Sequence, residues 1–161
     1  MATLSPQQRH EQIARMRRLP EDLAAAVKGL NDTQLDTPYG EGKWTIRQVV
    51  HHLADSHMQA FGRVKLIVTE DKPAFKPYNG NEWARLPDAQ RAPIAPSLKI
   101  LEGLHHRWCD LLSALPDAAW QRHATHPERG DVTLDDQIAI YASHGEKHIG
   151  HIMGLRKAKG W

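Results

Sequence analysis

Apolar residues recur three to four positions apart in several stretches of this chain, which is the spacing of the buried face of a helix. The longest stripe follows Thr45, whose hydroxyl suits a helix N-cap, and it predicts one helix over about residues 45–70. Its apolar positions are Ile46, Val49, Val50, Leu53, Ala54, Ala60, Phe61, Val64 and Val68. This helix is long enough to cross a small domain from end to end.

Two shorter helices are predicted before this stripe. Residues 6–18 form a polar helix with Ile13 and Met16 on one side. A second helix is predicted to begin at Pro20, because proline suits the first helical position, and to end near Gly29. Its apolar positions are Leu23, Ala26, Val27 and Leu30.

The second half of the chain begins with a proline-rich segment, residues 71–96, which predicts a long loop with a helical turn or two around residues 82–86. Ser97 is a candidate cap for a helix that runs to about Ala114. Residues 122–131 predict a loop or a short extended hairpin, and Thr133 starts the last helix.

Four principal helices with one long crossing loop indicate an all-α protein, a four-helix bundle. No internal repeat, low-complexity segment or linker divides the chain, so residues 1–161 are predicted to form a single domain. Loops as long as the crossing segment are usually functional.

Composition narrows the classes of function. The net charge is +2 and basic residues are dispersed, which argues against a nucleic-acid partner. The single cysteine, Cys109, excludes an internal disulfide and suits a reducing compartment. The polar start of the chain, residues 1–12, lacks the apolar run of a signal peptide, and no stretch approaches the roughly 20 apolar residues of a membrane span. A cytoplasmic location without membrane attachment is expected.

Histidine is abundant, and its placement near the C-terminus is distinctive. His144 and His148 lie four residues apart in Y-A-S-H-G-E-K-H-I-G-H-I, residues 141–152, so one helix face carries both. Two imidazoles placed in this way can bind one divalent metal ion, and a catalytic site needs a third ligand. The long predicted helix offers four choices. These are His51, His52, Asp55 and His57, of which helical phase favours His57.

Four segments resemble the DinB/YfiT-like metalloproteins, in particular the branch described as metal-dependent hydrolases and as bacillithiol S-transferases. The first is L-D-T-P-Y-G-E-G-K-W-T-I-R-Q-V-V-H-H-L-A-D-S-H-M at 35–58. The others are K-P-Y-N-G-N-E-W-A at 76–84, T-H-P-E-R-G-D-V-T-L-D at 125–135 and S-H-G-E-K-H-I-G-H-I at 143–152. The resemblance covers most of the chain, with its motifs in the expected order.

This resemblance implies a four-helix bundle with a three-histidine site that holds one zinc or nickel ion per chain. The family's first ligand precedes a Leu-Ala-Asp stretch, which selects His52 over His57, and the other two ligands match His144 and His148. The resemblance also suggests a homodimer. The residues around Gly80 depart from the family pattern, which puts substrate preference in doubt.

Three functions compete at this stage. The leading hypothesis is a metal-dependent thiol S-transferase that activates a low-molecular-weight thiol, such as bacillithiol, and conjugates it to an electrophile in detoxification. The alternatives are a metal-dependent, amidase-like hydrolase and a non-catalytic stress protein that binds a metal or ligand. The group that handles protons stays open, with Asp55, His126 and His151 as candidates.

Overall fold

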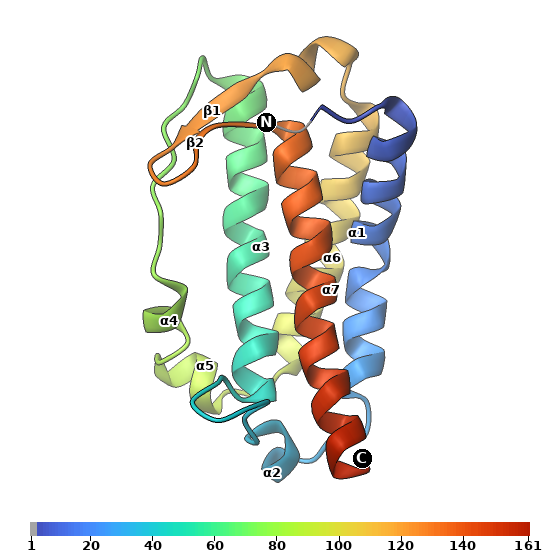
Figure 1. The fold of residues 1–161 in the computed structure, drawn as a ribbon, viewed down its shortest axis with the longest axis vertical. Coiled ribbons are helices and arrows are strands. Elements are labelled where there is room, and N and C mark those ends of the chain that lie inside the picture. Colours follow the sequence, from blue (N-terminus) through green and yellow to red (C-terminus); the bar gives the residue numbers. More distant parts are fainter. Residues whose placement is uncertain (1–2) are drawn as a thin grey trace.

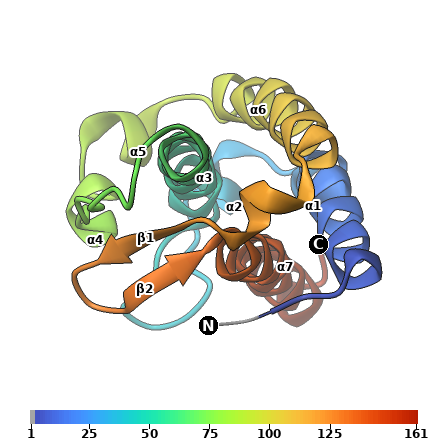
Figure 2. The ribbon, with the colours of Figure 1, turned by 90° about the horizontal axis from the view of Figure 1, so that it is seen from above.

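Four long helices form the body of the protein in the computed structural model, which describes residues 3–161 (Figure 1). They are α1 (Pro6–Val27), α3 (Ile46–Thr69), α6 (Ala95–Ala114) and α7 (Leu134–Lys159). Helices α1 and α3 each pack against both α6 and α7, so α1 and α3 occupy diagonal corners when the bundle is seen from above (Figure 2). The predicted all-α four-helix bundle is confirmed.

The crossing segment, residues 70–94, gives this bundle its connectivity. It returns along the outside of α3 from one end of the bundle to the other, so that α3 and α6 run in the same direction (Figure 1). Two short helices interrupt it, α4 (Gly80–Trp83) and α5 (Pro87–Arg91). The helical turn or two expected around residues 82–86 overlaps the end of α4 and reaches Leu86, the N-cap of α5.

Helix α1 is continuous, and the prediction of two separate helices is wrong. Pro20 lies inside α1 and cannot donate a backbone hydrogen bond to the carbonyl of Met16. That carbonyl instead accepts a hydrogen bond from Nδ1 of His105, at 2.7 Å. Met16, Leu19 and Leu23 are buried on either side of the proline, so packing holds the helix together through it.

Helix α6 begins three residues earlier than a cap at Ser97 predicts, because its N-cap is Ile94. Pro96 occupies the first turn, where a missing N–H has no cost. Ser97 lies buried inside the helix, with its hydroxyl 2.8 Å from Nδ1 of His51 on α3. Nε2 of His51 lies 3.1 Å from the carbonyl of Ala92, so both ring nitrogens of His51 contact groups at the start of α6.

The remaining elements close the ends of the bundle. Thr45 and Thr133 cap α3 and α7 as predicted, each within a capping box. A hairpin of β1 (His123–His126) and β2 (Gly130–Thr133) confirms the extended alternative for residues 122–131. Thr125 of this hairpin bonds through its backbone to the crossing segment at Pro73 and Phe75. The minor elements are α2 (Asp32–Leu35) and the 3-10 helix η1 (Asp117–Gln121).

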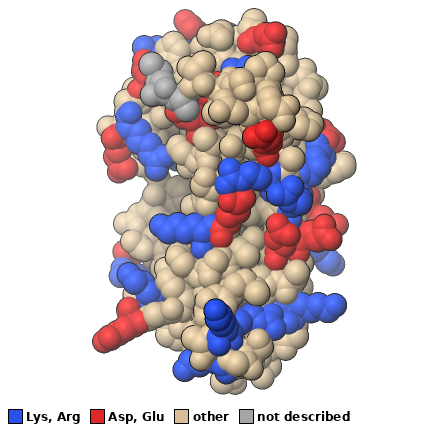
Figure 3. Space-filling view, turned by 45° about the vertical axis from the view of Figure 1, so that its right-hand side comes forward, with Lys and Arg blue, Asp and Glu red and all other residues tan. Residues whose placement is uncertain are grey.

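The surface is mixed in charge. Basic and acidic side chains are interspersed over the face shown in Figure 3, in agreement with the dispersed charge of the sequence. None of the helices within residues 3–161 is both long and apolar enough to cross a membrane.

Candidate metal centre

Three histidine side chains meet between α3 and α7. His144 and His148 lie one turn apart on α7, and His52 projects from α3. One ring nitrogen from each lies within 4.8 Å of the other two. The fold thus brings together the three predicted ligands, although His52 and His144 are 92 positions apart in sequence.

The spacing of these nitrogens suits ligands of one metal ion. Nε2 of His52 lies 3.2 Å from Nε2 of His144. Two imidazole nitrogens bound to one tetrahedral zinc ion at about 2.0–2.1 Å lie about 3.3 Å apart. His52 and His144 therefore lie at the spacing of two ligands of a zinc-sized ion, with a nitrogen of His148 within 4.8 Å of both, and three imidazoles suit zinc or nickel chemically.

Burial keeps these imidazoles neutral. Loss of hydration lowers the pKa of His52 to about 4, and the nearby His148 adds to the shift. Burial and the charge of His52 lower the pKa of His144 to about 4, and burial and His144 lower that of His148 to about 3. At neutral pH each ring then keeps a free lone pair, which is the form that binds metals.

Aromatic rings and one glycine pack around the cluster. The indole of Trp44 lies 4.5 Å from the ring of His52 and 6.1 Å from that of His148, measured between centroids. Tyr141 meets His144 edge-on at 5.8 Å. A β-carbon on Gly80 would lie 3.5 Å from Cε1 of His52, so the crossing segment reaches the cluster closely.

Two separate clefts reach the histidines. A cleft of about 210 Å³ includes His144 and lies between α3, α7, the hairpin and the crossing segment; we call it the arginine cleft. Its polar lining consists of Ser56, Arg63, Tyr78, His126, Glu128, Arg129, Gln137, Tyr141 and His144. A second cleft of about 310 Å³ includes His148, and we call it the lysine cleft. Its lining consists of Tyr39, Gly42, Lys43, Trp44, Asn81, Lys147, His148 and His151.

The structure separates the three candidates for proton handling. His126 lines the arginine cleft, and its Nδ1 accepts a hydrogen bond from the backbone of Glu128 at 3.1 Å. His151 lines the lysine cleft and stacks on Tyr39 at 4.3 Å. Asp55 lines neither cleft, and within residues 3–161 no hydrogen bond joins it to the three histidines.

Two buried histidines lie behind the cluster: His57, which the sequence analysis weighs as a third ligand and sets aside for His52, and His105, which it does not single out. Nε2 of His57 lies 3.1 Å from Nδ1 of His144, and Nδ1 of His57 lies 2.8 Å from Nε2 of His105. His57 follows the apolar stripe of α3, and His105 is spaced with Leu101, Trp108 and Leu112 on the inner face of α6. The available signal in the sequence was a histidine at a position where the helical pattern predicts a buried apolar residue.

Comparison with known proteins agrees with this geometry. Residues 15–152 match the DinB superfamily. A protein of Geobacillus thermodenitrificans is 52% identical over 94% of this chain and 85% of its own length, and one of Oceanobacillus iheyensis is 48% identical over 94% and 88%. Both are named "Putative metal-dependent hydrolase".

A solved structure is similar over the whole fold. YfiT from Bacillus subtilis, described as "a probable metal-dependent hydrolase with an unusual four-helix bundle topology", matches with a TM-score of 0.97 and 41% identity. The match covers 100% of this chain and 93% of YfiT. The agreement in sequence and in fold shows that this chain belongs to the DinB superfamily.

Proposed function

We propose that this protein is a metal-dependent enzyme in which His52, His144 and His148 hold one zinc or nickel ion and which transfers a small thiol to an electrophile. The observation that carries the proposal is a set of three neutral imidazoles at ligand spacing, reached by two clefts. An ion held by three neutral ligands keeps its +2 charge and deprotonates a bound thiol.

The two clefts support a reaction of two substrates. His144 lines the arginine cleft and His148 lines the lysine cleft, so each cleft leads to a different member of the cluster. A thiol held in one cleft and an electrophile held in the other would meet at the three histidines. Such positioning is a large part of catalysis when two molecules must react.

The charge of the clefts favours an anionic thiol. Arg63 and Arg129 line the arginine cleft, whereas Glu128 is its only acidic lining residue among those described. Because Nδ1 of His126 already accepts from the backbone of Glu128, the neutral ring carries its proton on Nε2 and can donate to an anion. A thiol that carries carboxylates, as bacillithiol does, has the matching charge.

Hydrolysis is the second candidate, and the names of the relatives favour it. A three-histidine metal centre also lowers the pKa of bound water toward roughly 7. The buried Nδ1 of His151, which has no hydrogen-bond partner among the described residues, is then the candidate proton acceptor near His148. A hydrolase requires no thiol.

Turnover of a model electrophile with and without thiol separates the two candidates. Zinc- and nickel-loaded protein is incubated with a fluorogenic haloalkane or a fluorogenic amide, each with or without a cysteine-containing carboxylated thiol. The transferase proposal predicts conjugate only when thiol and metal are both present. Thiol-independent hydrolysis of amide substrates, with no conjugate formed, would contradict transfer and leave hydrolysis.

A further inference from the structure

A line of hydrogen-bonded groups crosses the bundle behind the candidate metal centre. It runs from the carbonyl of Met16 on α1 through His105 on α6 and His57 on α3 to His144 on α7. The three distances are 2.7, 2.8 and 3.1 Å. All four long helices therefore contribute one member to this histidine chain.

The direction of every hydrogen bond follows from the group at its far end. A carbonyl oxygen only accepts, so Nδ1 of His105 must carry the proton that binds the carbonyl of Met16. Burial lowers the pKa of His105 to about 4, so the ring is neutral and its Nε2 is an acceptor. Nδ1 of His57 must then donate to it.

The same reasoning continues to the cluster. His57 is fully buried, with the rings of Trp108 and Tyr141 meeting it edge-on. A neutral His57 that donates from Nδ1 presents a lone pair on Nε2, so Nδ1 of His144 donates to it. The lone pair of His144 is thereby left on Nε2, the atom that lies 3.2 Å from Nε2 of His52.

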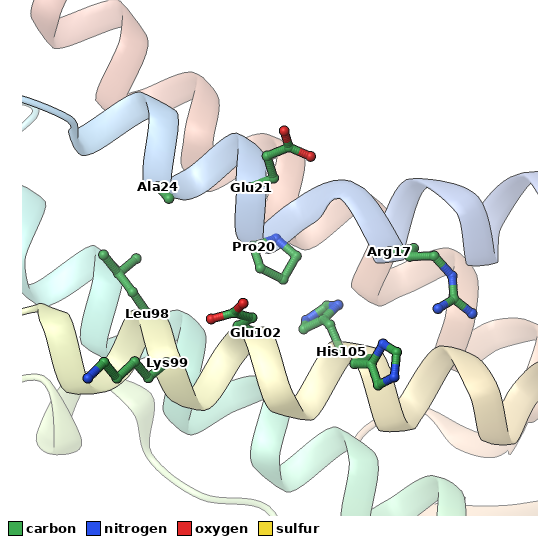
Figure 4. Close-up of a pocket in the computed structure, with 9 residues that line it drawn as sticks. Arg17, Pro20, Glu21, Ala24, Leu98, Lys99, Glu102 and His105 are labelled. Atoms are coloured by element: carbon green, nitrogen blue, oxygen red, sulfur yellow. The ribbon is translucent and has the colours of Figure 1, made fainter.

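Pro20 makes the first acceptor available. In an uninterrupted helix the carbonyl of Met16 would accept from the backbone N–H of residue 20, which proline lacks. Figure 4 shows Pro20 and His105 on facing helices, both lining the groove between α1 and α6. Pro20 removes one backbone hydrogen bond from α1 and thereby frees the carbonyl of Met16 to accept from His105.

We propose that His57 and His105 are positioning residues that, anchored on the carbonyl of Met16, fix the proton of His144 on Nδ1 and hold its Nε2 ready to bind metal. The proposal rests on the proposed function only in treating His144 as a metal ligand. Groups that orient ligand imidazoles in this way typically change metal affinity about 10- to 100-fold when removed.

The proton positions can be read directly from long-range ¹H–¹⁵N correlation spectra of the full-length protein, before and after zinc is added. The proposal predicts that His57, His105 and His144 all carry their proton on Nδ1 in both spectra. A proton on Nε2 of any of the three in the metal-free protein would overturn it. This outcome does not depend on turnover, so the chain and the proposed reaction can fail separately.

A matched pair of α6 variants tests transmission to the metal. His105→Phe removes the acceptor of His57, which should leave His144 in a mixture of tautomers and weaken zinc binding about 10- to 100-fold in chelator competition. Cys109→Ala, one turn along α6, removes a buried thiol that contacts the carbonyl of Ile13 and does not belong to the histidine chain, so it should change neither readout. Equal zinc affinity and tautomers in both variants would overturn the proposal. If His105→Phe does not fold, the wild-type spectra still decide.

Discussion

Gly145 of α7 lies against Leu19 of α1 so closely that a β-carbon on the glycine would lie 1.8 Å from Cδ1 of the leucine and 3.1 Å from its Cγ. Both residues are buried, and Gly145 follows His144 directly. The close approach of the two helices at this point therefore also sets the position of the turn of α7 that carries His144.

Gly145→Ala should destabilise the protein, because the added methyl group displaces a buried leucine. We expect the free energy of unfolding to fall by about 1–3 kcal/mol in urea denaturation, the usual cost of overpacking a core. Gly154→Ala is the matched control on the same helix, since no atom from elsewhere in residues 3–161 lies within 4 Å of its β-carbon position. It should be neutral or stabilising by up to about 1 kcal/mol. Equal effects of the two substitutions would show that the contact is unimportant.

Arg9→Ala should destabilise the protein because it leaves the buried carboxylate of Asp135 without its ion-pair partner. Asp135 is almost fully buried and accepts hydrogen bonds from Nε and Nη2 of Arg9 and from the backbone of Leu4. Breaking a buried pair by removing one partner costs about 3–5 kcal/mol. Arg17→Ala is the control on the same helix as Arg9, and it removes an exposed ion pair with Asp110 of α6. It should lower the free energy of unfolding by less than about 1 kcal/mol. A loss for Arg9→Ala no larger than the control would contradict this.

The metal-free protein should lose stability as the pH falls from about 6.5 toward 4. Burial lowers the pKa of His52, His105 and His144 to about 4 in the folded state, whereas unfolded histidine titrates near 6.5. The unfolded chain then binds more protons, and each such histidine lowers the free energy of unfolding by about 1.4 kcal/mol per pH unit. Urea denaturation at pH 7 and pH 5 measures the difference, and equal values at the two pH values would contradict it.

The fold was largely predictable from sequence because its helices carry regular apolar stripes and threonine caps. The break predicted at Pro20 was wrong, since a local rule about proline cannot anticipate a side chain from α6 that satisfies the freed carbonyl. The prediction of Ser97 as a cap was wrong for a similar reason, because its hydroxyl lies at hydrogen-bonding distance from His51 on another helix.

The site was predictable only in part. The four-residue spacing of His144 and His148 identified one helix face, but helical phase favoured His57 as the third candidate over His52. In the structure His57 lies within hydrogen-bonding distance of His144 from behind. His52, on the flank of α3, is the residue of that helix whose ring joins His144 and His148 in the cluster. Helical phase predicts which positions of a helix are buried. His57 is the fully buried histidine and lies behind the cluster, whereas His52 belongs to the cluster itself.

Arg129→Gln should weaken recognition of an anionic thiol. Arg129 lines the arginine cleft, where its charge favours a carboxylate on the substrate. We expect KM for a carboxylated thiol to rise about 2- to 5-fold, the range of one exposed charge interaction, while KM for a neutral thiol is unchanged. Arg85→Gln is the control, because Arg85 pairs with Glu82 and lines neither cleft. Equal KM changes for both thiols would place the anionic group elsewhere.

Metal content, measured in wild-type protein, His144→Ala and His106→Ala after purification without chelators, tests the central claim most directly. His106 is exposed on α6 and belongs to neither the cluster nor the histidine chain, so it controls for loss of a histidine. We predict one zinc or nickel ion per chain in wild type and in His106→Ala, and loss of that ion in folded His144→Ala. Wild-type protein without metal, or His144→Ala with its metal retained at wild-type affinity, would contradict the three-histidine centre.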